Sequence, residues 1–250
     1  MRFLSDSYVY HSEESLNRSI KNHLLAEEYK LNEYIFISLL KNKSLGNYLT
    51  SDLNKLRVLS IAKRNKLNIP NTAITNHGDY INKLNDSLES SVVTKFISEI
   101  YNNIEANTTH FFSFTELIKT RSVIGRDFIF PGLFQQKIEK LCDIRSFLLN
   151  GNFFSMALFP INSDKHKIDF RENYDIGLRM IPFALPKQIC RMLLNTFTDL
   201  NLDTGSIDLI LDKTGKYFFI EINPVGDFSM VSNNCNYYIE KHIAKYLHEM

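Results

Sequence analysis

Residues 205–224 read GSIDLILDKTGKYFFIEINP and contain the pattern from which the fold can be predicted. Two runs of β-branched and aromatic residues flank the turn sequence Asp212–Gly215, which predicts a β-hairpin. If Leu211 pairs with Lys216 across the turn, Asp208 lies opposite Phe219. This register sets the side chains that the hairpin presents on each face.

Three oxygen-bearing side chains then share one face of the hairpin. Asp208, Glu221 and Asn223 lie together because side chains alternate along a strand. Two carboxylates and an amide oxygen suit Mg²⁺, a hard cation that takes oxygen ligands together with phosphate. Spacing alone does not separate this metal face from a hairpin with an acidic residue at each rim, so both interpretations stay open here.

Composition excludes several classes of protein. The chain has 250 residues, of which 44% are hydrophobic and 23% charged, as in globular proteins that fold as one large or two small domains. A net charge of +1 gives no electrostatic case for nucleic acid as the main partner. No apolar run approaches the roughly 20 residues that span a bilayer. The three cysteines form no CxxC pair, so we expect free thiols and a cytoplasmic protein without a membrane partner.

The order of the predicted elements indicates an α+β fold. From about residue 90 onward the chain is rich in strands, joined as antiparallel hairpins and covered by helices. Asn150-Gly151 between two apolar runs is the strongest hairpin signal. The predicted helices are 12–31, with a further apolar segment at 34–40, then 52–67, 80–88, 187–200 and 237–247; the predicted strands include 71–75 and 91–97, and 225–236 is expected to be a loop.

Charged residues inside predicted strands are the remaining candidates for chemistry. Lys95 is the single charge of strand 91–97, and Asp143 and Arg145 share a strand face. An edge-protecting lysine and a structural ion pair are the alternatives. GxGxxG, GxxxxGK[ST], GxSxG and kinase motifs are absent from the sequence. A lysine, an arginine and an oxygen-rich face can bind phosphates and Mg²⁺ without a glycine-rich loop.

Several short motifs also follow one another in a recognisable order. They are Asn54-Lys55-Leu56 with Ile69-Pro70-Asn71-Thr72, Val93-Thr94-Lys95, Phe134-Gln135-Gln136-Lys137-Ile138, Asp143-Ile144-Arg145, Ile207-Asp208-Leu209-Ile210 and Glu221-Ile222-Asn223-Pro224. This order resembles that of the ATP-grasp ligases. Residues 221–232, EINPVGDFSMVS, and 236–241, NYYIEK, resemble more narrowly the grasp-with-spasm and microviridin-type maturases that make graspetides. The resemblance covers roughly residues 50–250.

The resemblance implies an ATP-grasp fold, in which two α+β lobes with antiparallel sheets grip ATP. Residues 1–50 would be a mostly helical remnant of a truncated N-terminal pre-ATP-grasp domain. Residues 51–250 would form the ATP-grasp domain, with a smaller lobe at about 70–133 and a C-terminal lobe with the metal site at about 134–250.

It also implies a role for each matching residue. Lys55 and Lys95 match the lysines that contact ATP phosphates, and Arg145 is placed with Lys95 at the reacting phosphoryl group. The other matches are Gln135, Gln136, Lys137 and Ile138 at the adenine hinge, Asp143 at the ribose, Asp208, Glu221 and Asn223 at Mg²⁺, and Asp169, Arg171 and Arg179 at the substrate. Gln135 departs from the glutamate that is common at the first hinge position.

The function implied is a ligase that uses ATP and two Mg²⁺ ions. It would phosphorylate side-chain carboxylates of a ribosomal precursor peptide, composed of a leader and an acidic, Thr-rich core. A hydroxyl or amine of the same peptide would then form an ω-ester or ω-amide crosslink, and a homodimer is compatible with this function. The alternatives are an ATP-grasp ligase that acts on a small molecule or adds amino acids to a protein, and a non-catalytic peptide-binding relative.

Overall fold

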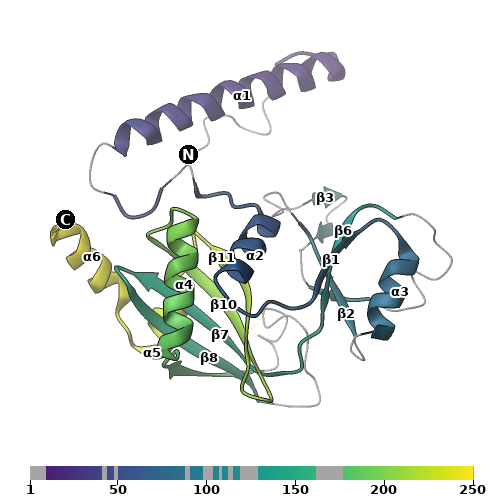
Figure 1. Ribbon diagram of the computed structural model, residues 1–250. Coiled ribbons are helices and arrows are strands. Elements are labelled where there is room, and N and C mark those ends of the chain that lie inside the picture. Colours follow the sequence, from purple (N-terminus) through teal and green to yellow (C-terminus); the bar gives the residue numbers. More distant parts are fainter. Residues whose placement is uncertain are drawn as a thin grey trace.

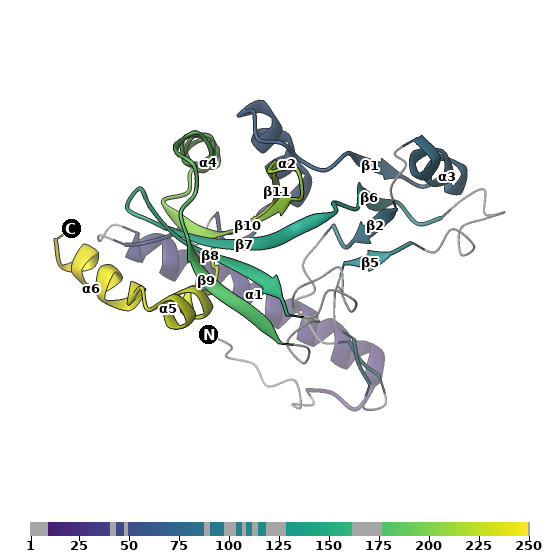
Figure 2. The same cartoon turned by 90° about the horizontal axis from the view of Figure 1, so that it is seen from below.

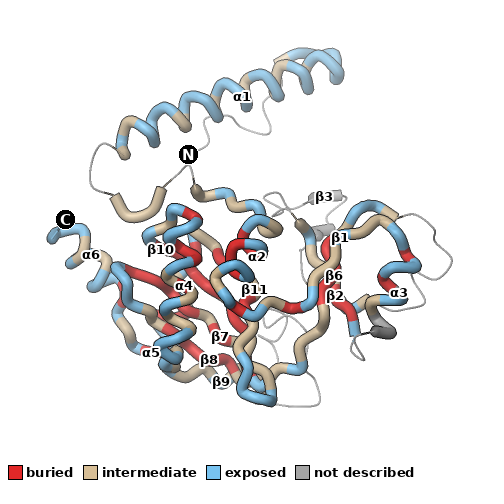
Figure 3. Tube along the Cα trace, in the orientation of Figure 1, coloured by how far each residue is buried: buried red, intermediate tan, exposed pale blue. Residues whose placement is uncertain are grey.

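Two antiparallel sheets organise the protein (Figure 1). The computed structural model describes residues 10–40, 44–47, 50–87, 91–97, 104–106, 109–111, 115–118, 129–161 and 177–249. Helices lie outside both sheets, and buried residues concentrate in the strands and on the helix faces that meet them (Figure 3). No helix in these ranges is both long and apolar enough to cross a membrane.

The smaller lobe is built on a four-stranded sheet in the order β1-β6-β2-β5. The strands are β1 (Thr72–Thr75), β2 (Val92–Lys95), β5 (Glu116–Leu117) and β6 (Gly132–Gln136). Helix α3 (Gly78–Ser87) packs on one face, where Ile81, Val92 and Phe134 form a small core. A separate hairpin joins β3 (Ile104–Ala106) to β4 (Thr109–Phe111).

The larger lobe is built on a five-stranded sheet in the order β11-β10-β7-β8-β9. Its strands are β7 (Lys140–Leu149), β8 (Asn152–Pro160), β9 (Leu178–Phe183), β10 (Thr204–Asp212) and β11 (Tyr217–Asn223). The predicted Asn150-Gly151 turn is confirmed, since Leu149 pairs with Asn152 and both turn residues have positive φ, 47° and 75°. A two-residue turn with this backbone matches the twist of the strands that it joins.

Different helices cover the two faces of this sheet (Figure 2). On one face, α2 (Lys55–Arg64) and α4 (Lys187–Asp199) bury a core that includes Ile144, Leu193 and Phe197. On the other, α5 (Ser229–Cys235) and α6 (Ile239–Glu249) cover a second core around Phe147 and Met156. The charged residues of this second face, Arg145, Asp208 and Glu221, are not part of the core that α5 and α6 cover.

Two predictions about helices were wrong in their detail. The segments expected at 12–31 and 34–40 form one helix, α1 (Glu14–Leu39), none of whose residues is buried. The loop expected at 225–236 contains α5, because Val231 and Cys235 pack into the second core and stabilise a helical turn that the local sequence does not favour strongly.

The predicted register of the β10–β11 hairpin was also wrong. Asp208 lies opposite Glu221 and not Phe219. Leu211 pairs with Tyr217, and a β-bulge between Asp208 and Leu209 shifts the register by a further residue. Each one-residue shift alone would separate the acidic side chains, but the two shifts together keep them on one face. Asp208 and Glu221 are directly paired, and directly paired residues point to the same side of a sheet.

The two lobes are joined by two short segments. Residues 137–139 connect β6 to β7, and residues 65–71 connect α2 to β1. The backbone N–H of Gln136 donates to Asn71 O at 2.9 Å, so the two segments are tied together. Strand β6 belongs to the smaller sheet and runs to Gln136, so the connection between the two sheets lies at residues 137–139. The smaller lobe was expected to end a few residues earlier, at about residue 133.

Truncation of Phe197 to alanine tests the larger core. This side chain is 1% exposed and packs between α4 and the sheet, so we expect Phe197→Ala to lower the free energy of unfolding by about 3–5 kcal/mol. Leu247→Ala is the matched control, because Leu247 is 45% exposed on α6. Urea denaturation of both variants measures the difference, and equal losses would contradict this assignment of the core.

Candidate functional site

A row of charged side chains crosses three strands of the larger sheet. Asp208 on β10 pairs with Glu221 on β11 and, on its other side, with Arg145 on β7. Arg145 Nη1 lies 3.5 Å from both carboxylate oxygens of Asp208. The side chains of Arg145 and Asp208 are only 15% and 20% exposed. The sheet thus holds two carboxylates and a guanidinium on adjacent strands, on the face that α5 and α6 partly cover.

Burial is the main influence on the pKa of Asp208. Burial raises the pKa of the Asp208 carboxyl to about 7, and the guanidinium of Arg145 opposes this rise. The carboxylates of Glu221 and Asp143 raise it further, while Lys95 lowers it. A carboxyl so far above its usual range gains from a nearby cation, which favours the ionised form.

The turn after β11 fixes the third oxygen ligand of the predicted set. Asn223 Oδ1 accepts a hydrogen bond from the N–H of Val225 at 3.0 Å, and Asn223 O accepts one from Gly226 at 3.1 Å. Gly226 lies so close to Ser206 that an added Cβ would stand 2.2 Å from Ser206 Oγ. The turn therefore requires glycine here, and it orients an amide oxygen that retains a second lone pair.

These three residues suit a hard divalent cation. Within the described ranges no three His, Cys, Asp or Glu side chains gather as a metal cluster, so a site of that kind is not formed there. Asp208, Glu221 and Asn223 offer two carboxylates and one amide, the oxygen ligands that Mg²⁺ takes together with phosphate. Raised pKa, shared face and fixed amide together fit such an ion.

Arg145 has unused hydrogen-bonding capacity. Its Nε is buried and has no hydrogen-bond partner among the residues that the structure describes. An orphaned guanidinium N–H is costly unless an acceptor binds there, and phosphate and carboxylate are the usual acceptors. Asp143, the alternative partner considered for Arg145, is paired with Lys140 at 2.7 Å.

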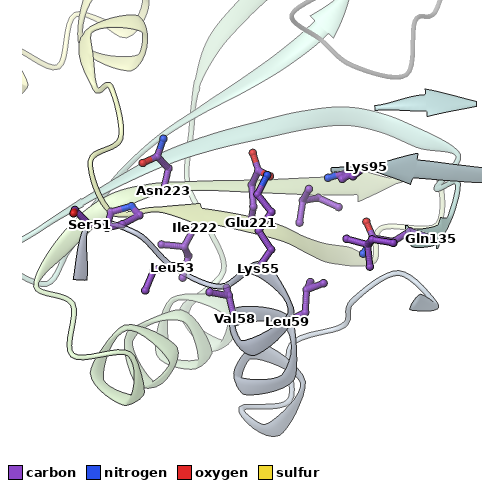
Figure 4. Close-up of a pocket in the computed structure, with 13 residues that line it drawn as sticks. Ser51, Leu53, Lys55, Val58, Leu59, Lys95, Gln135, Glu221, Ile222 and Asn223 are labelled. Atoms are coloured by element: carbon purple, nitrogen blue, oxygen red, sulfur yellow. The ribbon is translucent and has the colours of Figure 1, made fainter. Parts of the chain in front are cut away.

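A pocket opens beside this row, between the two lobes. Its empty space is about 570 Å³, which includes space open to solvent. Helix α2 contributes one wall, β11 another, and β2 and β6 of the smaller lobe a third (Figure 4). The lining residues are Ser51, Leu53, Lys55, Val58, Leu59, Lys95, Leu133, Gln135, Ile220, Glu221, Ile222, Asn223 and Pro224.

The pocket brings together predicted residues that are far apart in sequence. Lys55 from the first turn of α2, Lys95 from β2 and Glu221 from β11 all line it. Leu133 pairs with both Ile74 and Lys95, so these three side chains share the inner face of the smaller sheet. This face therefore combines an apolar surface with a cation.

Gln135 sits on the same face with its amide orientation determined by a hydrogen-bond chain. Its Nε2 donates to Thr72 Oγ1 at 3.0 Å, and Thr72 Oγ1 donates to Pro70 O at 2.7 Å. Because the hydroxyl proton is committed to Pro70, the hydroxyl must accept from the amide nitrogen. The Gln135 side chain is 2% exposed and keeps its Oε1 as an acceptor.

The hinge residues after Gln135 are partly committed to the protein itself. The N–H groups of Gln136 and Lys137 donate to Asn71 O and Ser91 O at 2.9 and 2.8 Å. Lys137 Nζ also pairs with Glu139 at 2.9 Å. An adenine at this hinge would thus have to use other groups, such as Gln135 Oε1 and the backbone around Ile138.

Of the three predicted substrate residues the structure describes only Arg179, which does not lie at this site. Asp169 and Arg171 lie outside the described residues. Arg179 is exposed on β9, the edge strand opposite β11, and pairs with Phe159. Phe159 packs against the core under α2 and α4, so Arg179 lies on the other face from Asp208.

Two features of the site were missed by sequence reasoning. Lys140 forms the ion pair with Asp143, and its spacing of three residues gave no strand-face signal. Asp227 stands beside Arg145, which helps to lower its pKa, yet the segment was treated as a plain loop. The run 221–232 contains Asp227, and an acidic residue just after the predicted metal-binding hairpin was the available signal.

Substitution of Asp208 tests the electrostatics without a substrate. The folded-state pKa of about 7 exceeds the reference value of 3.8, so the free-energy contribution of Asp208 is fully present below pH 3.8 and is lost as pH rises through about 7. Asparagine imitates the neutral carboxyl. In EDTA we expect Asp208→Asn to be more stable than the wild type at pH 8, by on the order of 2 kcal/mol, with the gap closing toward pH 4.

Thermal unfolding from pH 4 to 8 measures this gap. Asp212→Asn is the control, because hydrogen bonds from Lys216 and Thr214 outweigh burial and lower the pKa of Asp212. That control should be destabilised at pH 8. Parallel stability curves for Asp208→Asn and the wild type would refute the raised pKa.

Comparisons with known proteins agree with this geometry. The family profile of the RimK-like ATP-grasp domain matches residues 52–247. Among curated proteins, none matches the chain. The fold is similar to that of several solved structures whose sequences are less than 25% identical to this chain, a likeness that concerns the fold.

Three of these structures are complexes with a peptide or a nucleotide. The first is a Chryseobacterium gregarium RiPP-associated ATP-grasp ligase with ADP and a leader and core peptide (TM-score 0.73, 24% identity, 90% of this chain and 69% of that one). The second is the macrocyclase MdnC of Microcystis aeruginosa MRC with precursor peptide MdnA (0.75, 24%, 99% and 75%). The third is the ATP-grasp ligase PsnB with a phosphomimetic variant of minimal precursor, Mg and ADP (0.73, 14%, 98% and 75%).

The profile match spans most of the chain, and the two-lobed architecture agrees with it. The chain belongs to the RimK-like ATP-grasp domain family.

Proposed function

We propose that this protein is an ATP- and Mg²⁺-dependent ligase that crosslinks a ribosomal precursor peptide. The observation that carries the proposal is the Glu221–Asp208–Arg145 row beside a pocket lined by two lysines. Glu221 and the two lysines line the pocket, and Asp208 and Arg145 follow Glu221 on the neighbouring strands, so oxygen ligands, a guanidinium and two ammonium groups lie in one region. This is the set that carboxylate activation by ATP requires.

The metal-binding part of the site comprises Asp208, Glu221 and Asn223. Bound there, Mg²⁺ would neutralise charge on the phosphates of ATP and orient them. The chain's own contribution is to hold two carboxylates and an oriented amide oxygen on one face of β10 and β11. Burial is the main cause of the raised pKa of Asp208, and a cation bound beside this carboxyl would favour its ionised form, which supports the assignment.

The nucleotide would lie between the lobes. Lys55 and Lys95 would bind its phosphates, since both line the pocket that also contains Glu221. The adenine would rest against the inner face of the smaller sheet, where Ile74 and Leu133 offer apolar surface and Gln135 an acceptor. ATP would thus bridge the hinge and the charged row.

The reaction would proceed in two steps. A side-chain carboxylate of the peptide attacks the γ-phosphorus of ATP, giving an acyl phosphate and ADP. A hydroxyl or amine of the same peptide then displaces phosphate, giving an ester or an amide. Arg145 would neutralise the carboxylate and then the acyl phosphate, and Lys95 the transferring phosphoryl group, from fixed positions on the sheets.

A peptide substrate is supported by the similar structures. One of them contains a leader and core peptide, another a precursor peptide, and the third a phosphomimetic variant of a minimal precursor with Mg and ADP. The fold similarity extends over 90–99% of this chain. We extend the peptide substrate to this chain on that basis, together with the complete set of charged residues at its own site.

The Gln135–Thr72 chain generates a prediction about the base. Gln135 Oε1 would accept from the exocyclic amine of adenine, whereas guanine presents a carbonyl at that position. Thr72→Val removes the hydroxyl that fixes the amide. We expect its ATP-over-GTP preference in KM to fall about tenfold, since a site built to bond an N–H discriminates against its absence.

Isothermal titration with ATP and GTP, each with Mg²⁺, measures the same ratio without turnover. Thr75→Val on the same strand is the control, because Thr75 pairs with Gly132 and not with the hinge. An unchanged ratio of ATP to GTP affinity in Thr72→Val would show that the hydrogen bond between Thr72 and Gln135 does not select the base.

The proposed activity is tested with peptides encoded by small acidic reading frames beside the gene. Incubation with Mg-ATP should release ADP and phosphate and remove one water per crosslink from the peptide, as measured by intact mass. Glu221→Gln should reduce turnover on the order of 100-fold, because a charged metal ligand becomes neutral. Glu249→Gln, exposed at the end of α6, should leave it unchanged.

Other products would contradict the proposal in recognisable ways. A gain in mass would indicate ligation of an added amino acid or small molecule. Peptide binding in a calorimeter without binding of Mg-ATP would indicate a non-catalytic receptor. Hydroxylamine added to the reaction should trap the acyl phosphate as a hydroxamate, and a phosphorylated product without hydroxamate would indicate another intermediate.

A further inference from the structure

The helical cover of the active face ends immediately beside Arg145. Ser206 lies two residues before Asp208 on β10 and on the same face of the sheet. It pairs with both Asn223 and Phe147. The ring of Phe228 packs on Phe147 with centroids 5.2 Å apart. Ser206 Oγ donates to the carbonyl of Asp227 at 3.2 Å. The backbone of Asp227 therefore contacts the sheet at the Ser206–Phe147 pair. This pair lies between the core under α5 and the row formed by Glu221, Asp208 and Arg145.

The carboxylate of Asp227 is held but still accessible. The N–H of Ser229 donates to its Oδ1 at 2.7 Å, and Ser229 Oγ donates to the same oxygen. These bonds, followed by the charge of Arg145, lower the pKa of Asp227. The residue is exposed, and a carboxylate has further acceptor positions on its second oxygen. An oriented acceptor thus lies beside Ser206, which is two residues from Asp208 on the same face of β10, and Asp208 pairs with Arg145.

We propose that Asp227 binds the attacking O–H or N–H of the peptide and positions it against the acyl phosphate. This inference rests on the proposed function. Arg145 holds the acyl phosphate from the sheet, and the backbone of Asp227 is anchored to Ser206, two residues before Asp208. The two groups thereby flank the carbon that must be attacked. Orientation of this kind contributes to rate by lowering the entropy lost on reaching the transition state.

The step that Asp227 assists is balanced without a further reactant. The lone pair of the attacking oxygen or neutral nitrogen forms a bond to the acyl carbon. The bond from that carbon to the phosphate oxygen breaks, and its electron pair leaves with phosphate. The proton of the attacking group ends on the phosphate, so the products are the ester or amide and hydrogen phosphate. Asp227 accepts a hydrogen bond from that O–H or N–H until the proton leaves for the phosphate.

The test compares Asp227→Asn with a carboxylate of matching geometry. Asp212, at the other end of the same hairpin, also accepts from the N–H and hydroxyl of the residue two positions later, Thr214. Asp212→Asn therefore controls for loss of a turn carboxylate. Asp227→Glu restores the charge. The probe is the peptide that loses water with the wild-type chain, and the readout is ADP released per crosslink formed.

A positioning role predicts uncoupling. In Asp227→Asn, crosslinking should fall at least about tenfold while ADP release stays within about threefold of wild type, because the acyl phosphate is then lost to water. Hydroxylamine, which needs no docking to Asp227, should still give hydroxamate at the wild-type rate. Asp227→Glu should restore part of the coupling, and Asp212→Asn should match the wild type.

Three results would overturn the assignment. Equal loss of ADP release and crosslinking would place Asp227 in the first step, and unchanged coupling would remove it from the site. A raised Mg²⁺ requirement in Asp227→Asn would make it a metal ligand. Absence of water loss from every peptide with the wild-type chain would instead reject the proposed function, and this inference with it. Peptides with a single hydroxyl or a single lysine then show which attacking group Asp227 serves.

Discussion

The burial of Asp208 between Glu221 and Arg145 is the constraint on which the site depends. Two carboxylates stand directly opposite each other on β10 and β11, and the single guanidinium at 3.5 Å does not offset the cost of burying them. A protein that keeps this arrangement has a site of stored electrostatic free energy. In the proposed site, a divalent cation at the carboxylates and a phosphate at Arg145 would offset this cost.

The rest of the larger lobe holds this row in place. A β-bulge brings Glu221 opposite Asp208, and the turn that contains Gly226 orients the amide of Asn223. Helices α2 and α4 bury the far face of the sheet, while α5 covers the near face only up to Phe147. Glu221, at one end of the charged row, therefore lines the pocket together with Lys55 and Lys95.

Much of this could be predicted from the sequence, because strong local patterns decided it. Asn150-Gly151 predicted its hairpin, and alternation along β11 placed Glu221 and Asn223 on one face. The register could not be predicted, since a bulge depends on how the strand packs and leaves no mark in the residue pattern. Helix α5 is stabilised by Val231 and Cys235 in a tertiary core, which a short polar segment does not reveal. The partners of Asp143 and Arg145 likewise depend on neighbouring strands and not on spacing.

A structure with ADP and Mg²⁺ bound tests the central claim most directly. We expect an ion about 2.1 Å from oxygens of Asp208, Glu221 and Asn223, with phosphate oxygens and water completing its octahedral coordination shell. We also expect Arg145 Nε to donate a hydrogen bond to an anion. An ion bound by other residues, or an Asp208 that keeps Arg145 as its sole partner while ADP is bound, would contradict the claim.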